Sequence, residues 1–173
     1  MVLAIFLIVG LDVGINTNIQ NLLTQQFGVS LERASLAISI YFSALMVTRF
    51  LGAVLLSKID NLQFLLWSAL ATVLLLIGLI FSTSMLMANV MIFLIGIASG
   101  NFFPIVFSLT VNKMPERANE ISGLMIMAVV GGAIVPPLMG IINTSFGVQL
   151  SFGILVFCAA YVAMTFFVFK KQA

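Results

Sequence analysis

The first hydrophobic segment of this chain contains the stretch GLDVGINTNIQN, residues 10–21, where an ordinary membrane-spanning helix would be wholly apolar. Asp12, Asn16 and Gln20 follow one another at intervals of four residues, so on a helix they form one polar stripe. A charged side chain near the bilayer centre costs about 2.5–3.5 kcal/mol to insert. The stretch therefore predicts a helix whose polar face meets neighbouring helices or a water-filled cavity.

The composition of the whole chain is that of an integral membrane protein. Of its 173 residues, 62% are hydrophobic and only 7% are charged, whereas about a quarter of the residues of an ordinary soluble domain are charged. The formal net charge of +2 is too small to favour nucleic acid as a partner. The composition predicts the lipid bilayer as the surroundings of the chain.

The residue types exclude several kinds of chemistry. The chain has no histidine and a single cysteine, Cys158, so an intrachain disulfide, a histidine metal site and a Ser/His/Asp triad are all excluded. We find neither a nucleophile–base pair nor a cluster of metal ligands in the sequence. We therefore expect a protein that is not an enzyme and that holds neither a metal nor an organic cofactor.

Six apolar segments are long enough to cross a membrane, for which about 20 residues are needed. Each is predicted to be a helix, because a backbone surrounded by lipid must satisfy its own hydrogen bonds. We expect one all-α domain over residues 1–173, with spans at approximately 2–26, 34–56, 63–82, 85–111, 119–142 and 148–169.

The basic residues between the segments predict the orientation. With six spans, alternate loops lie on alternate sides of the membrane. One side carries Lys58, Lys113, Arg117, Lys170 and Lys171, and the other carries only Arg33. Because basic loops stay in the cytoplasm, we expect both termini to be cytoplasmic in a bacterial-type inner membrane.

Segments one and four show the same kind of interruption. Glycines and amides interrupt both, at Gly10, Gly14 and Asn16 in the first, and at Gly96, Gly100 and Asn101 in the fourth. Corresponding interruptions three spans apart indicate a three-plus-three inverted repeat, and in transporters such paired interruptions mark the substrate site.

The polar stripe has two interpretations. It can form the wall of a substrate cavity, or a hydrogen-bond cluster that only holds helices together. Asp12 lies about 15 Å into its span, close to the midplane, so a coupling ion is a third role for this carboxylate. We favour the cavity wall, with Asp12, Asn16 and Gln20 as substrate ligands.

Two further polar residues lie within spans. Arg49 either pairs with Asp12, which lies at a similar depth on the preceding span, or serves as a structural residue near a cytoplasmic gate. Asn101 either donates a hydrogen bond to a substrate hydroxyl or satisfies carbonyls freed by a bend at Pro104. We predict Asn101 to be a fourth substrate ligand and Arg49 to be a gating residue.

Segment five contains residues suited to close packing and bending. Gly131 and Gly132 let helices approach closely, and Pro136 and Pro137 remove backbone hydrogen bonds. We interpret these four as gating or structural residues.

Several motifs together resemble one transporter family. They are NFFPIVFSL at residues 101–109, GLMIMAVVGGAIVPPLMG at 123–140, RFLG at 49–52 and VGLD at 9–12. The sequence resembles the second half of the L-fucose/glucose/galactose–proton symporter family of the major facilitator superfamily. The resemblance covers nearly the whole chain and implies helices seven to twelve of a twelve-helix transporter that works by alternating access. It also implies that the proton-coupling acidic residues of the family belong to the first half.

The predicted function is therefore one half of a proton-coupled monosaccharide symporter. Its expected partners are the sugar, the lipid bilayer and a second set of six helices, from the N-terminal half of a longer protein or from a second copy of this chain. The alternatives are a self-associating half-transporter, a channel, and a membrane subunit that transports nothing.

Overall fold

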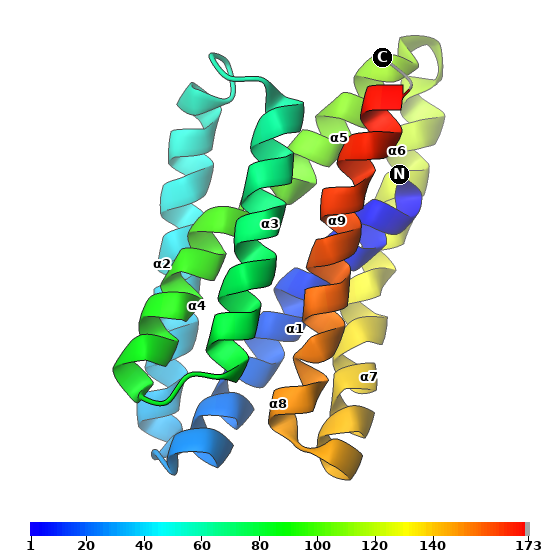
Figure 1. The fold of residues 1–173 in the computed structure, drawn as a ribbon. Coiled ribbons are helices and arrows are strands. Elements are labelled where there is room, and N and C mark those ends of the chain that lie inside the picture. Colours follow the sequence, from blue (N-terminus) through cyan, green and yellow to red (C-terminus); the bar gives the residue numbers. More distant parts are fainter. Residues whose placement is uncertain (172–173) are drawn as a thin grey trace.

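The structure is a computed structural model that describes residues 1–171, and these residues form helices and no strands. The first three spans are single helices: α1 (Val2–Phe27), α2 (Leu31–Leu55) and α3 (Asn61–Ile80). The fourth span is α4 (Met85–Ser99) followed by α5 (Phe102–Lys113). The fifth combines η1 (Pro115–Arg117), α6 (Ala118–Met127), η2 (Ala128–Val130) and α7 (Gly131–Phe146). The sixth combines α8 (Val148–Ser151) and α9 (Gly153–Lys171) (Figure 1).

The predicted all-helical membrane fold is confirmed. Six helical segments of the described chain are long and apolar enough to cross a bilayer, at 2–27, 31–52, 61–80, 85–113, 115–146 and 148–170. The second span begins three residues before the expected position, with Ser30 as the N-cap residue and Glu32 in the first turn, and the Ser30 side chain makes no capping hydrogen bond. The fifth span extends farther at both ends than expected, because a 3₁₀ turn precedes it and α7 continues to Phe146.

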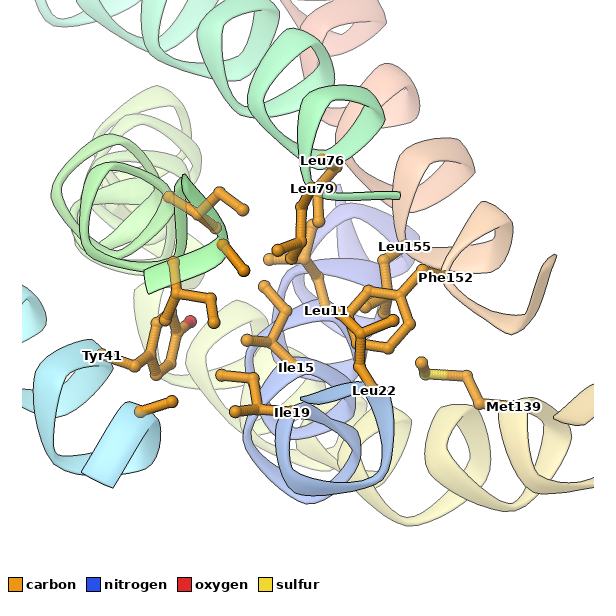
Figure 2. Packing of buried hydrophobic residues seen from close by; sticks show 14 of the residues in the cluster. Leu11, Ile15, Ile19, Leu22, Tyr41, Leu76, Leu79, Met139, Phe152 and Leu155 are labelled. Carbon is orange, nitrogen blue, oxygen red and sulfur yellow. The ribbon is translucent and has the colours of Figure 1, made fainter. Parts of the chain in front are cut away.

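Helix α1 lies at the centre of the bundle and packs against α2, α7 and α9 (Figure 1). One of its faces supplies Leu11, Ile15, Ile19 and Leu22 to the larger hydrophobic core, where all four are almost fully buried. Figure 2 shows these side chains between Tyr41 of α2 and Phe152 of the last span. The polar stripe lies on a different face of α1 from this buried set.

The two predicted interruptions have different outcomes. Span four is interrupted where α4 ends at Ser99 and α5 begins at Phe102, as expected. Span one is not interrupted, so that prediction is wrong: α1 is one continuous helix of 26 residues. Its glycines serve close packing instead, since a Cβ on Gly14 would lie 2.8 Å from Leu155 Cδ2 and 3.0 Å from Met139 Sδ.

Span five changes geometry before its proline pair. The 3₁₀ turn η2 separates α6 from α7, whereas α7 runs on through Pro136 and Pro137. At the start of α7, Gly131 touches α1 so closely that a Cβ would overlap the Phe6 carbonyl. A Cβ on the next residue, Gly132, would lie 2.9 Å from Val13 Cγ2. The glycine pair therefore lets α7 and α1 pack backbone to backbone.

The outer surface is apolar and the charges gather at the ends. Large exposed hydrophobic side chains occur on every long helix, for example Leu36, Trp67, Leu74, Ile141 and Phe157, which is the arrangement that lipid favours. The α2–α3 and α5–η1 connections and the end of α9 lie at one end of the bundle, together with the start of α1 (Figure 1). This end carries Lys58, Lys113, Arg117 and Lys170, and Arg33 lies at the opposite end.

Candidate functional site

Asp12 and Arg49 line two neighbouring cavities, the wider of which is open to the outside of the bundle. The first has a volume of about 80 Å³ and is bounded by α1, α2 and the α4–α5 junction, with Ser99, Gly100, Phe102 and Phe103 among its lining residues. The second is wider, with about 430 Å³, and lies between α1 and α2, where Phe42, Met46 and Phe50 also line it. Asp12, Leu45 and Arg49 belong to both cavities, so they form the boundary between them.

Asp12 is held in place by a tyrosine. The Tyr41 hydroxyl donates a hydrogen bond of 2.5 Å to Oδ1 of Asp12. Tyr41 is fully buried in the larger core, so its ring cannot move without disturbing that core. A buried tyrosine hydroxyl needs a hydrogen-bond partner, and Asp12 supplies it. Oδ2 of Asp12 forms no hydrogen bond with any residue from 1 to 171.

Arg49 is held by a backbone carbonyl. Its Nε lies 3.4 Å from the Gly100 oxygen and donates to it. That carbonyl is available because Pro104, four residues later, has no N–H to donate to it. The side chain of Arg49 is otherwise exposed. The interruption of span four thus positions the guanidinium beside the cavity.

The ion pair between Asp12 and Arg49, one of the two alternatives for Arg49, is not formed. In the described part of the chain, Arg117 and Glu120 form the single ion pair, at 2.7 Å on the surface. Asp12 is engaged by Tyr41 and Arg49 by Gly100, so the two charges line one cavity without meeting across it.

Asn16 and Gln20 continue the face of α1 on which Asp12 lies. Both are partly exposed, and within residues 1–171 neither side chain forms a hydrogen bond. Asn18, between them in sequence, differs: it is 6% exposed and donates to the Gly14 carbonyl at 3.0 Å. The stripe therefore has free amide groups, which can bind a ligand or a second protein segment. Their role as substrate ligands stays a prediction.

Asn101 lies apart from this group. It is 3% exposed, and its Nδ2 donates to the Thr48 carbonyl at 3.1 Å. The Thr48 hydroxyl in turn donates to the Ile97 carbonyl at 2.8 Å. These two bonds join α2 to the end of α4, and Gly52 leaves the space that the amide fills. The geometry shows a helix-to-helix contact, and a sugar contact by Asn101 stays a prediction.

The sequence interpretation missed three side chains of the site. Tyr41, Phe42 and Phe103 surround Asp12 and Arg49. Tyr41 could have been found, because a tyrosine in the middle of an apolar span requires a hydrogen-bond acceptor and Asp12 is the acidic residue at a similar depth on the neighbouring span. Phe42 and Phe103 carry no such signal among the 16 phenylalanines of the chain.

Comparison with known protein families identifies the superfamily of the protein that contains this site. A model of the Major Facilitator Superfamily matches residues 1–173. The chain belongs to the major facilitator superfamily. Its structure is similar to a crystal structure of FucP, a transporter of the same superfamily in the outward conformation. The two superpose with a TM-score of 0.89 at 22% sequence identity. The match covers 99% of this chain and 41% of that one.

Curated relatives of this major facilitator protein carry sugar-transporter names. The glucose/galactose transporter of Brucella abortus biovar 1 (strain 9-941) is 29% identical over 163 residues, which are 93% of this chain and 39% of that protein. The putative glucose/galactose transporter of Helicobacter pylori (strain ATCC 700392 / 26695) is 28% identical over 165 residues, 92% of this chain and 40% of that protein. The chain thus spans about two-fifths of the length of these relatives. The predicted resemblance to this transporter family is confirmed.

Proposed function

We propose that this chain is the C-terminal half of a proton-coupled monosaccharide symporter that works by alternating access. The main support for the proposal is one observation: on α1, Asp12 lines a cavity that opens to the outside of the bundle, and the amides of Asn16 and Gln20 are partly exposed on the same face. The superfamily membership and the names of the glucose/galactose transporters support it. So does the structural likeness to the E. coli fucose:proton symporter FucP, at 21% identity and a TM-score of 0.89.

The chemistry of this face suits a sugar. Each hydroxyl of a monosaccharide both donates and accepts a hydrogen bond. A carboxylate accepts two or more such bonds, and an amide accepts and donates. Exposing such a polar face to lipid without hydrogen-bond partners costs free energy. The face therefore needs water, a ligand or a second set of helices opposite it. In a transporter these occupy the face in turn.

A second half completes the cavity. The chain covers about two-fifths of the length of its relatives, and both cavities are partly open to the outside of the bundle. We propose that six further helices close them, from an N-terminal half of the same protein or from a second copy. The basic residues at the end that holds α1's start favour cytoplasmic termini in a bacterial-type inner membrane.

The coupling ion that we propose is the proton, and no cofactor or metal takes part. Alternating access then involves the contact between α1 and α7, with bending near η2 and the proline pair and with Gly131 and Gly132 at the contact. The chain transports and carries out no covalent chemistry on the sugar.

The test is uptake of labelled fucose, galactose and glucose into proteoliposomes, with and without an inward proton gradient. The first sample holds this chain alone, and the second holds it together with the six-helix half that precedes it in a complete protein of the family. Saturable, gradient-driven uptake in the second sample supports the proposal. The same uptake in the first sample means that two copies of the chain assemble one transporter.

Two outcomes would contradict the proposal. Flux that neither saturates nor responds to the proton gradient would indicate a channel. Well-folded, monodisperse protein that moves no sugar in either sample would indicate a membrane subunit without transport. An Asp12→Asn variant belongs in the same assay, because wild-type uptake and wild-type gradient dependence in that variant would exclude a role for its charge.

A further inference from the structure

We propose that a neutral monosaccharide bridges Asp12 and Arg49, so that Arg49 is a substrate ligand and not a gating residue. The inference rests on the proposed transport of sugars and names the two charged groups that would recognise the substrate. Asp12 accepts hydrogen bonds from one or two hydroxyls, and the guanidinium of Arg49 donates to a hydroxyl or to the ring oxygen on the other side.

The first argument concerns where the charges of the chain lie. Its sequence has seven basic and five acidic residues. Ten of these twelve lie in loops or in the first or last turn of a helix, whereas Asp12 lies in the middle of α1 and Arg49 in the second-last turn of α2, both within membrane-spanning segments. Charged side chains are costly there and are retained for pairing or for function. Because these two do not pair with each other, function accounts for their retention.

The second argument concerns how each group is held. Tyr41 occupies one oxygen of Asp12 and leaves Oδ2 free, and the Gly100 carbonyl occupies Nε of Arg49. The two terminal nitrogens of Arg49 form no hydrogen bond with the described residues. Both groups are therefore fixed by one bond on the protein side while keeping polar atoms for a ligand. Asp12 is preorganised by its fully buried partner Tyr41, which favours binding because little freedom of the carboxylate is left to lose.

The third argument concerns the walls of the cavity. Phe42 and Phe50 line the wider cavity, and Phe103 lines the smaller one. Phe42 also contacts the Tyr41 ring edge-on, with centroids 6.0 Å apart. Small-ligand sites are mostly apolar and aromatic with a few polar groups that fix orientation, and they have volumes of about 300–1,000 Å³. The wider cavity, with about 430 Å³, is of that kind.

The pair of charges also selects the class of ligand. One carboxylate and one guanidinium give the site no net charge, so for an ionic ligand the attraction to one group is offset by repulsion from the other. A neutral polyol meets neither penalty and satisfies both groups. Among residues 1–171 no further ionisable side chain lines either cavity apart from these two.

The inference is tested by sugar binding, with this chain assembled with its second six-helix half in lipid nanodiscs and with fucose, galactose and glucose as probes. Calorimetry gives the dissociation constant for the wild type and for Asp12→Asn, Arg49→Gln and Arg49→Lys. We expect Arg49→Gln to weaken binding by about 10–100-fold, since that is the usual cost of losing a hydrogen bond to a charged group. Arg49→Lys keeps the positive charge but loses the planar set of guanidinium donors. Its affinity for the sugar should therefore lie between those of the wild type and Arg49→Gln.

The matched control is Arg33→Gln, because Arg33 lies on the same helix, in its exposed first turn. It should bind sugar like the wild type. Monodeoxy analogues of the best-bound sugar supply a readout that loss of folding would not mimic. The analogue that lacks the hydroxyl contacting Arg49 should bind the wild type more weakly and should lose no further affinity in Arg49→Lys.

The results separate two failures. If the wild type binds a sugar and Arg49→Gln binds it equally well, the bridging site is wrong while the proposed function stands. If removing any one hydroxyl of the sugar weakens binding by the same factor in the wild type and in Arg49→Lys, the bridging site is also wrong. If the wild-type chain binds none of the three sugars, the site and the proposed role of this half in sugar binding both fail.

Discussion

The Tyr41 hydroxyl lies 2.5 Å from Oδ1 of Asp12 and joins the middle of α2 to the polar face of α1. The tyrosine ring is fully buried in the larger core, whereas Asp12 faces the two cavities. One hydrogen bond therefore connects the buried core of the bundle to the polar face of α1. The position of the carboxylate depends on core packing as well as on its own helix.

Replacing Tyr41 with phenylalanine keeps the ring and removes the hydrogen bond to Asp12. A hydrogen bond to a charged group contributes about 1.5–3 kcal/mol, so we expect a loss of this size in the free energy of unfolding. Denaturation of the purified chain in detergent micelles measures it. Tyr161→Phe is the control, because within residues 1–171 the Tyr161 hydroxyl has no hydrogen-bond partner. Equal stability of the two variants would show that the Tyr41 bond contributes nothing.

Alanine at Gly131 should destabilise the bundle. Its Cβ would overlap the Phe6 carbonyl, and a backbone atom cannot rotate away as a side chain can. We expect a cost of about 1–3 kcal/mol, typical of overpacking.

Gly140→Ala in the same helix is the matched control and should have the opposite sign. No atom lies within 4 Å of a Cβ built there, so alanine should raise stability by about 0.5–1 kcal/mol through helix propensity. Thermal unfolding of both variants under one set of conditions decides the matter. A neutral or stabilising Gly131→Ala would exclude the close α1–α7 contact.

Asn101→Ala should loosen the junction between α2 and the α4–α5 interruption. The change removes the donor to the Thr48 carbonyl, and hydrogen bonds between membrane helices contribute about 0.6 kcal/mol on average, up to about 1.7. Asn112→Ala is the control, since Asn112 is exposed and its amide bonds only to Ser108 within its own helix. Sugar affinity measured on the same samples separates the two roles: unchanged affinity in a less stable Asn101→Ala supports a purely structural residue.

A Pro136→Ala, Pro137→Ala double variant tests bending of span five. Alanine restores the N–H groups that can bond the carbonyls of Gly132 and Ala133, four residues earlier. We expect equal or greater stability and a several-fold slower sugar uptake by the complete transporter, because a stiffer α7 resists the proposed bending. Faster or unchanged uptake would locate the moving region elsewhere, with η2 as the remaining break in this span.

Much of the membrane architecture followed from hydrophobic length alone. A backbone in lipid must bond to itself, so every apolar run of spanning length had to be helical. The interruption at Gly100 and Asn101 was also predictable, because glycine, an amide and Pro104 follow one another there. The continuity of α1 was not, because whether a glycine breaks a helix or admits a neighbour depends on what packs beside it. Here Leu155, Met139 and Val135 occupy the space next to Gly14.

For the polar residues, too, some features were predictable from the sequence and others were not. The spacing of Asp12, Asn16 and Gln20 determined by itself that they share a face, since the helical period is a local property of the chain. Which face meets a cavity, that Tyr41 reaches Asp12, and that Arg49 bonds to Gly100 and not to Asp12 were decided by the tertiary structure. These contacts join residues 29 to 51 positions apart in sequence. Helix tilt and side-chain packing alone bring such residues together, and no periodicity within one segment contains that information.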